Sequence, residues 1–247
     1  MPPCRPAAGG MMSIMASFVA AVFDFDGLLL ETEGPVFQSW AETYEEHGQT
    51  LSLGRWLLTI GRVDHVDPAA ELERRLGRAL TTEERRRRRD RRDELLLALG
   101  PCAGAAESLR DARSLGLRTA VASSSGREWV ESHLRRLGLD GYIDELSCYD
   151  GTLPAKPWPD LYLRALELVG AEPGAAVAFE DSHNGLQAAK AAGLVCVVVP
   201  TPMTASMDFT LADRVIERLG RPPLAELLEE LAPRPAASGG PDRSGRG

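Results

Sequence analysis

An apolar run near the start of the chain ends in two aspartates separated by one residue and followed by a glycine. The segment from Val22 to Gly27 reads VFDFDG. Because side chains two residues apart lie on the same side of a strand, we expect Asp24 and Asp26 to point together where the strand ends. Two carboxylates this close repel each other unless a cation separates them or one is protonated. The pattern predicts a divalent-metal site or a nucleophile and acid pair, with an Asp-rich turn as the alternative.

The composition is ordinary for a globular protein and limits the possible partners. Of the 247 residues, 44% are hydrophobic and 26% are charged. The net charge of −8 argues against general nucleic-acid binding, and no apolar run approaches the roughly 20 residues of a membrane-spanning helix. The four cysteines are far apart, without the spacing of metal ligands. We therefore expect a cytoplasmic monomer with free thiols that binds neither nucleic acid nor membrane.

Strand and helix patterns alternate along most of the chain. Runs rich in β-branched and apolar residues predict strands at Val19–Phe25, Leu117–Ala122, Ile143–Cys148, Ala175–Phe179 and Leu194–Val199. Helical patterns lie between them at Ala103–Leu115, Arg127–Leu137, Asp160–Val169 and Asn184–Ala192. Uniformly apolar strands that alternate with helices are typical of a parallel sheet covered on both faces. The sequence predicts an α/β fold with a doubly wound parallel sheet.

One segment, residues 34–99, breaks this alternation. It contains helical patterns at Pro35–His47, Pro68–Leu76 and Thr81–Leu99 and no convincing strand. We expect it to form a small α-helical cap domain inserted into a core made of residues 18–33 and 100–232. Residues 1–17 and 233–247 are expected to be a disordered leader and a disordered tail, the tail because it is rich in Pro, Gly, Ser and Ala.

An arginine-rich stretch inside this segment invites a nucleic-acid interpretation. From Glu83 to Glu94 the chain holds seven arginines, but also five acids. Glu83 and Arg87, like Glu84 and Arg88, stand four residues apart, a spacing that favours ion pairs on a helix. We therefore expect a solvated, internally paired helix face.

Polar residues follow four of the predicted strands. Beyond the aspartates, Ser123 and Ser124 open a hydroxyl-rich turn, Lys156 is one of only two lysines, and Glu180 and Asp181 precede a helix. Serines and acids at helix starts also serve as plain caps. Because an open parallel sheet binds ligands beyond the carboxyl ends of its strands, four such ends together predict a site for Mg²⁺ and phosphate.

These segments resemble the motifs of the haloacid dehalogenase-like (HAD) superfamily. The chain is most similar to the branch of phosphatases and β-phosphoglucomutases that carry a helical cap after the first motif. The matching segments occur in the order of the family: Asp24–Gly27, Ala122–Ser125, Lys156–Asp160 and Phe179–Gly185.

The resemblance implies a role for each motif residue. Asp24 would be the nucleophile that becomes an aspartyl phosphate. Asp26 would protonate the leaving alcohol, then take a proton from water, and its backbone carbonyl would bind the metal. The phosphoryl oxygens would be held by Ser123, Ser124 and Lys156, and Mg²⁺ by Asp24, Asp26, Glu180 and Asp181.

The predicted function is a Mg²⁺-dependent phosphatase acting on a small phosphorylated metabolite, with Arg62 and His65 of the cap as candidate substrate contacts. Asp26 argues against haloacid dehalogenation, and the absence of lysine between residues 34 and 99 argues against phosphonate hydrolysis. A phosphosugar mutase of the β-phosphoglucomutase type is the main alternative. Mutases of this kind carry a cap lysine and a histidine where this chain has Val36. A non-catalytic binding protein is a weaker alternative because the motif acids and Lys156 are all retained.

Overall fold

The computed structural model describes residues 17–57, 60 and 67–232. Its centre is one six-stranded sheet with the order β3-β2-β1-β4-β5-β6, in which every neighbouring pair is parallel. The strands are β1 (Ala20–Phe23), β2 (Arg118–Gly126), β3 (Glu145–Tyr149), β4 (Ala176–Glu180), β5 (Val195–Val198) and β6 (Arg214–Val215). The direction of winding reverses between β1 and β4, so the predicted doubly wound parallel sheet is confirmed.

Helices cover both faces of the sheet. They are α6 (Ala105–Ser114), α7 (Arg127–Leu137), α8 (Asp160–Val169), α9 (His183–Ala191) and α10 (Leu224–Leu231), with short 3₁₀ turns at Asp140–Tyr142 and Pro173–Ala175. In β1, Ala21 and Phe23 pack into the core beneath α6, α7 and α10, whereas Ala20 and Val22 pack against α8 and α9. Because both faces are buried, the strand sequence reads as a continuous apolar run.

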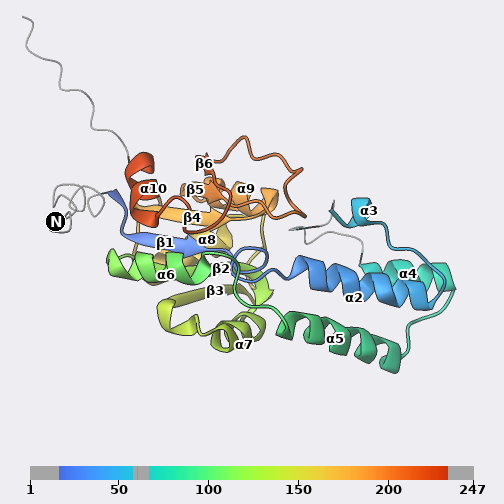
Figure 1. Ribbon diagram of the computed structural model, residues 1–247. Coiled ribbons are helices and arrows are strands. Elements are labelled where there is room, and N and C mark those ends of the chain that lie inside the picture. The colour runs from blue at the N-terminus through green and yellow to red at the C-terminus, as the bar shows by residue number, and fades with distance from the viewer. Residues whose placement is uncertain (1–16, 58–59, 61–66, 233–247) are drawn as a thin grey trace, which may run out of the picture.

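A helical region lies between β1 and β2 in the chain. It consists of α2 (Glu33–Glu46), α3 (Leu53–Leu57), α4 (Pro68–Leu76) and α5 (Thr82–Leu97). Figure 1 shows α2, α4 and α5 extending away from one end of the sheet. This region has its own small apolar cluster, made of Trp40, Tyr44, Trp56, Ile60, Ala69, Leu72 and Leu80. The helical insertion agrees with the sequence, while its domain limits at residues 34 and 99 stay predictions.

Local signals set the starts of two helices in this region. The side chain of Asp67 accepts a hydrogen bond from the backbone N–H of Ala69 at 2.9 Å, and Pro68 occupies the first helical position of α4. Thr81 and Glu84 bond reciprocally at the start of α5 and form a capping box. Such caps satisfy backbone N–H groups that have no partner within the helix.

The structure adds elements and corrects the expected ion pairs. Sequence patterns did not indicate α3, α10 or the two-residue edge strand β6, although leucines at 224, 227, 228 and 231 form a helical stripe. The internally paired face expected for this helix is present, because Arg86 pairs with Glu83 and Asp90 within α5. The specific pairs Glu83–Arg87 and Glu84–Arg88 are wrong. The observed partners are Arg86 for Glu83, Arg78 for Glu84, Glu46 for Arg87 and the Trp40 ring for Arg88.

The predicted leader, apart from Ser17, and the predicted tail lie outside the described residues. Within the described part, no helix has the length and apolar character needed to cross a bilayer.

Candidate active site

The loop that follows β1 is tightly turned and carries both motif aspartates. Gly27 has a φ of +85°, its N–H donates to the carbonyl of Leu30 at 2.8 Å, and Leu29 donates to the carbonyl of Phe25 at 3.0 Å. A Cβ on Gly27 would lie 2.2 Å from Oδ2 of Asp181. Glycine is therefore required both by the backbone angle and by the close approach of this carboxylate.

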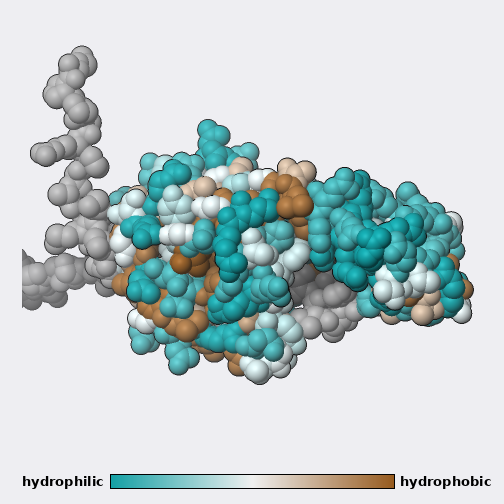
Figure 2. Space-filling view, turned by 90° about the horizontal axis from the view of Figure 1, so that it is seen from below, coloured by the Kyte–Doolittle hydropathy of each residue, from teal (hydrophilic) through white to brown (hydrophobic). Residues whose placement is uncertain are grey.

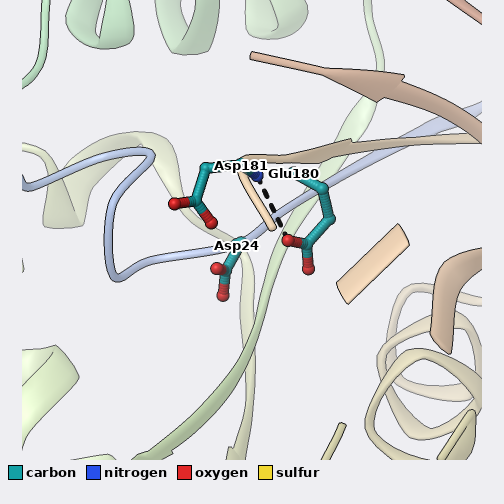
Figure 3. A group of neighbouring side chains, drawn as sticks. All are labelled: Asp24, Glu180 and Asp181. Atoms are coloured by element: carbon teal, nitrogen blue, oxygen red, sulfur yellow. Dashed lines mark hydrogen bonds between the residues drawn. The ribbon is translucent and has the colours of Figure 1, made fainter. Parts of the chain in front are cut away.

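Three buried carboxylates meet at the ends of β1 and β4. The side chains of Asp24, Glu180 and Asp181 offer oxygen atoms that lie within 4.8 Å of one another. Figure 3 shows the three groups converging from the two neighbouring strands. A Cβ on Gly185 would lie 1.9 Å from Cδ of Glu180, so the start of α9 leaves room for this carboxylate. The adjacent strand ends thus produce a compact acidic cluster.

Lys156 joins this cluster and neutralises part of its charge. Its Nζ donates to Oδ1 of Asp24 and to Oε1 of Glu180, each at 2.6 Å, and lies 5.2 Å from the ring centroid of Tyr162. Burial alone would lower the pKa of Lys156, but the two carboxylates raise it above its usual value. The ammonium therefore stays charged at neutral pH.

The carboxylates of Glu180 and Asp181 differ in their hydrogen-bond partners. The carboxylate of Glu180 already accepts hydrogen bonds from Lys156, the Tyr162 hydroxyl at 2.6 Å, and the N–H of Asp181 at 3.2 Å. Across the described ranges, no residue donates a hydrogen bond to the carboxylate of Asp181. Burial, followed by the charges of Asp24 and Glu180, raises the pKa of Asp181 well above its usual value.

The pKa of Asp24 is raised as well, which means that its ionised form is not fully stabilised by the groups around it. Burial and the charge of Glu180 raise the pKa of Asp24 to about 8, against the opposing effect of Lys156. A divalent cation held by Asp24 and Asp181 would favour the ionised form of both. Hard oxygen ligands of this kind suit Mg²⁺, so Asp24 and Asp181 are the residues that would hold it most directly, with Glu180 beside them.

The side chain of Asp26 lies apart from the acidic cluster. Its Oδ2 accepts from the Ser125 hydroxyl at 2.7 Å and from the Ser123 hydroxyl at 3.4 Å, and its Oδ1 accepts from Nε1 of Trp129 at 3.1 Å. The carboxylate therefore points toward the serines near the carboxyl end of β2, a strand that continues past Ala122, where the sequence predicted its end, to Gly126. Its position apart from the cluster is compatible with the acid–base role predicted for the side chain.

The structure brings most of the expected site residues together. The hydroxyl of Ser124 accepts from the backbone N–H of Lys156 at 3.3 Å, which ties the end of β2 to the loop that carries Lys156. The candidate cap contacts Arg62 and His65 lie outside the described residues. The catalytic and ligand roles of all these residues stay predictions.

Sequence reasoning missed four residues at the site: Ser125, Trp129, Tyr162 and Glu33. Ser125 stood within a matched motif and was overlooked because its neighbours were favoured. Tyr162 and Trp129 sit on amphipathic helices, where an aromatic residue is read as core. Their polar atoms reach carboxylates from distant segments, which no local pattern reveals.

Glu33, in the first turn of α2, is a further acid near the site. Burial, reinforced by Asp26 and Glu31, raises the pKa of Glu33 to about 7, while a hydrogen bond from Trp56 opposes the shift. A partly protonated carboxyl therefore borders the site on the side of the helical region.

The chain matches known proteins over most of its length. Residues 18–193 match the family described as haloacid dehalogenase-like hydrolase. YhcW of Bacillus subtilis (strain 168) is 38% identical over 213 residues, covering 86% of this chain and 97% of that protein. The phosphorylated carbohydrates phosphatase of Thermotoga maritima is 30% identical over 178 residues, covering 71% of this chain and 82% of that protein.

A solved structure supports the same relationship. CbbY from Rhodobacter sphaeroides, crystallised as a mutant in complex with xylulose-(1,5)bisphosphate, is 31% identical. The two structures align with a TM-score of 0.63, and the alignment covers 81% of this chain and 94% of the CbbY chain. The chain therefore belongs to the haloacid dehalogenase-like hydrolases, in the branch of CbbY and the β-phosphoglucomutase-like proteins.

Proposed function

We propose that this HAD-type phosphatase hydrolyses a small phosphomonoester, a sugar phosphate or a similar metabolite, through an aspartyl phosphate on Asp24 with Mg²⁺ as cofactor. The observation that carries the proposal is the position of Asp24. Oδ1 of Asp24 accepts a hydrogen bond from Nζ of Lys156 at 2.6 Å. Its carboxylate also lies within 4.8 Å of the carboxylate of Asp181, to which no described residue donates a hydrogen bond. The proposed nucleophile, a fixed cation and the proposed metal-binding acid thus meet at one point.

In the first step, a carboxylate oxygen of Asp24 forms a bond to phosphorus while the bond from phosphorus to the leaving oxygen breaks. Asp26 gives its proton to that oxygen, and the alcohol leaves. Lys156, Ser123 and Ser124 hold the phosphoryl oxygens in line for the transfer. When bound, Mg²⁺ supplies charge neutralisation for the phosphoryl group.

In the second step, water attacks the phosphorus of the aspartyl phosphate. Asp26, now ionised, takes a proton from the water, and Asp24 leaves with the electrons of its bond to phosphorus. Splitting the hydrolysis into two displacements lowers the barrier of each. The buried position of Asp24 limits the access of other nucleophiles.

The relatives support a sugar phosphate or a similar metabolite as the substrate. The Thermotoga maritima protein is named for phosphorylated carbohydrates, and CbbY was crystallised with a sugar bisphosphate. Validoxylamine A 7'-phosphate phosphatase of Streptomyces hygroscopicus subsp. limoneus is 29% identical over 196 residues and acts on a further phosphorylated metabolite by its name.

The test is Asp24→Asn, which keeps the shape of the side chain but removes the attacking charge. With p-nitrophenyl phosphate and Mg²⁺, we expect turnover to fall about a thousandfold or more, while circular dichroism shows an intact fold. Asp90→Asn on the exposed face of α5 is the matched control and should keep full activity. A variant at Asp24 that retains more than about a tenth of the turnover would refute the mechanism.

A phosphosugar mutase is the second candidate because the branch includes β-phosphoglucomutase-like proteins. Residues 34–99 contain no lysine, and Val36 stands where the mutase histidine is expected. We therefore expect β-glucose 1-phosphate to be hydrolysed faster than it is isomerised. Product analysis with Mg²⁺ and catalytic β-glucose 1,6-bisphosphate measures the ratio. Glucose 6-phosphate accumulating faster than inorganic phosphate would favour the mutase.

A further inference from the structure

Trp129 contacts Asp26 through an atom whose chemistry allows only one kind of hydrogen bond. The residue is half-buried in the first turn of α7, and its Nε1 lies 3.1 Å from Oδ1 of Asp26. An indole N–H donates and never accepts. While this bond stands, Oδ1 is an acceptor and carries no proton.

The other oxygen of Asp26 faces hydroxyl groups. Oδ2 lies 2.7 Å from Oγ of Ser125 and 3.4 Å from Oγ of Ser123. A hydroxyl can rotate to donate or to accept, so these contacts are compatible with both protonation states of Oδ2. Any proton held by Asp26 in this arrangement therefore resides on Oδ2.

We propose that Trp129 is a positioning residue that fixes Oδ1 of Asp26 as an acceptor and directs proton transfer through Oδ2. The proposal rests on the proposed function. In the first step, the O–H bond at Oδ2 breaks as the proton passes to the leaving oxygen, which keeps the electrons of its broken bond to phosphorus. The carboxylate that remains is negative, and the Trp129 N–H stabilises it. A hydrogen bond to an ionised acceptor is stronger than one to a neutral acceptor.

The indole ring is held in place by groups on other sides. The guanidinium carbon of Arg92, on α5, lies over the ring at 4.9 Å from its centroid. The ring of His133 meets it edge-on, with centroids 4.4 Å apart and planes at 72°. A cation over an aromatic face is a favourable contact. A side chain of the inserted helical region thus helps to orient the donor that contacts Asp26.

The alternative is that Trp129 only fills the edge of the core, against which it packs. Trp129→Phe separates the two because it keeps an aromatic ring but removes the N–H. The measurement is kcat/KM, which reports formation of the aspartyl phosphate, for p-nitrophenyl phosphate and for an alkyl phosphate. The alkyl alcohol is the poorer leaving group and needs the proton more.

We expect Trp129→Phe to lower kcat/KM about tenfold for the alkyl phosphate and less than about twofold for the aryl phosphate. Arg92→Met, which keeps an apolar side chain over the ring, should show the same selective loss at about twofold to threefold. Arg88→Met is the matched control, because Arg88 stacks on Trp40 within the helical region at 4.6 Å. It should leave both esters unchanged.

Asp26→Asn distinguishes failure of this inference from failure of the proposed function. If Asp26→Asn discriminates strongly against the alkyl phosphate and Trp129→Phe lowers both esters equally or neither, the assignment to Trp129 is overturned while the phosphatase mechanism stands. If Asp26→Asn itself shows no dependence on the leaving group, the proposed role of Asp26 fails and the inference fails with it. Selective loss in both variants supports the proposal.

Discussion

Charged side chains gather in two regions of this protein, on helix α5 and at the carboxyl ends of β1 and β4. On α5, Arg86 lies between Glu83 and Asp90, and these three side chains are 55%, 59% and 57% exposed. Asp24 and Lys156, at the strand ends, are almost completely buried. Figure 2 shows the helical region as a mostly hydrophilic surface when the molecule is seen from below.

The same residue types have different consequences in the two regions. On α5, water and salt screen each charge, so a lost partner is replaced by solvent. At the strand ends, a lost partner leaves a charge that no solvent reaches, at a cost of several kcal/mol. An arrangement that expensive, in a molecule with only two lysines, indicates chemistry more than stability. Substitutions in each region test this contrast.

The largest change in stability is expected from Lys156→Met. The substitution leaves Asp24 and Glu180 without their shared cation, so we expect the free energy of unfolding to fall by about 3–5 kcal/mol without Mg²⁺. Phosphatase turnover should fall about a thousandfold. Urea denaturation and hydrolysis of p-nitrophenyl phosphate measure the two effects.

The other lysine provides the matched control. Nζ of Lys190 lies 2.6 Å from Oδ2 of Asp213, the same separation as in the buried pair, but these side chains are 31% and 34% exposed. Lys190→Met should change stability by less than about 1 kcal/mol and leave turnover unchanged. Equal losses of stability in the two lysine variants would show that burial does not set the size of the effect.

The next effect concerns Asp181, whose carboxylate accepts no hydrogen bond from any residue that the structure describes. Because burial and its neighbours raise the pKa of Asp181, holding it ionised without a cation costs free energy. Asp181→Asn should therefore stabilise the metal-free protein, by roughly 1–3 kcal/mol. It should also abolish activity and the rise in Tm that Mg²⁺ gives the wild type.

Thermal unfolding of both proteins, with EDTA and with Mg²⁺, separates these outcomes. A variant that is less stable than the wild type in EDTA would mean that Asp181 has a donor or cation of its own. An undiminished response to Mg²⁺ would remove Asp181 from the metal site. Either result would mean that the strand-end cluster differs less from α5 in the cost of an unpaired charge than we expect.

Glu33, close enough to the strand-end cluster to contribute to the raised pKa of Asp181, gives an intermediate, pH-dependent effect. Its pKa is raised from 4.5 to about 7 on folding, so between these values the folded state keeps a proton that the unfolded state loses. Stability from this group is complete below about pH 4.5 and declines as the pH rises through 7. Glu33→Gln should be more stable than the wild type by roughly 1–2 kcal/mol at pH 8, with no gain near pH 4. Urea unfolding at several pH values checks this, and a gain independent of pH would contradict it.

The difference between the regions also explains what the sequence could predict. The sheet and the positions of Asp24, Lys156 and Glu180 follow from local patterns, because each residue stands at the end of an apolar run or in a distinctive loop. The contact of Trp129 with Asp26 joins residues 103 apart in the chain. Such contacts depend on how helices pack, which local spacing does not encode.

The predictions of the specific ion pairs Glu83–Arg87 and Glu84–Arg88 on α5 were wrong for the same reason. The spacing of Glu83 and Arg87 favoured a pair within the helix, but α5 packs beside α2, which presents Glu46 to Arg87. On an exposed helix several partners are nearly equivalent in energy. The choice among them is set by the neighbouring helix, whereas buried groups such as Lys156 have few alternatives.

The smallest effect is expected on α5, where Arg86→Met removes a guanidinium that contacts Glu83 at 2.7 Å and Asp90 at 2.6 Å. Because water replaces both contacts, Tm should fall by less than about 2 °C. The difference should shrink further in 1 M NaCl, where the screening length is about 3 Å. The loss in Lys156→Met should persist in the same salt, because its charges are buried away from ions. If 1 M NaCl abolished the loss of stability in Lys156→Met as well, dissolved ions would screen the strand-end charges as they screen surface charges. Burial would then no longer account for the raised pKa values of the cluster.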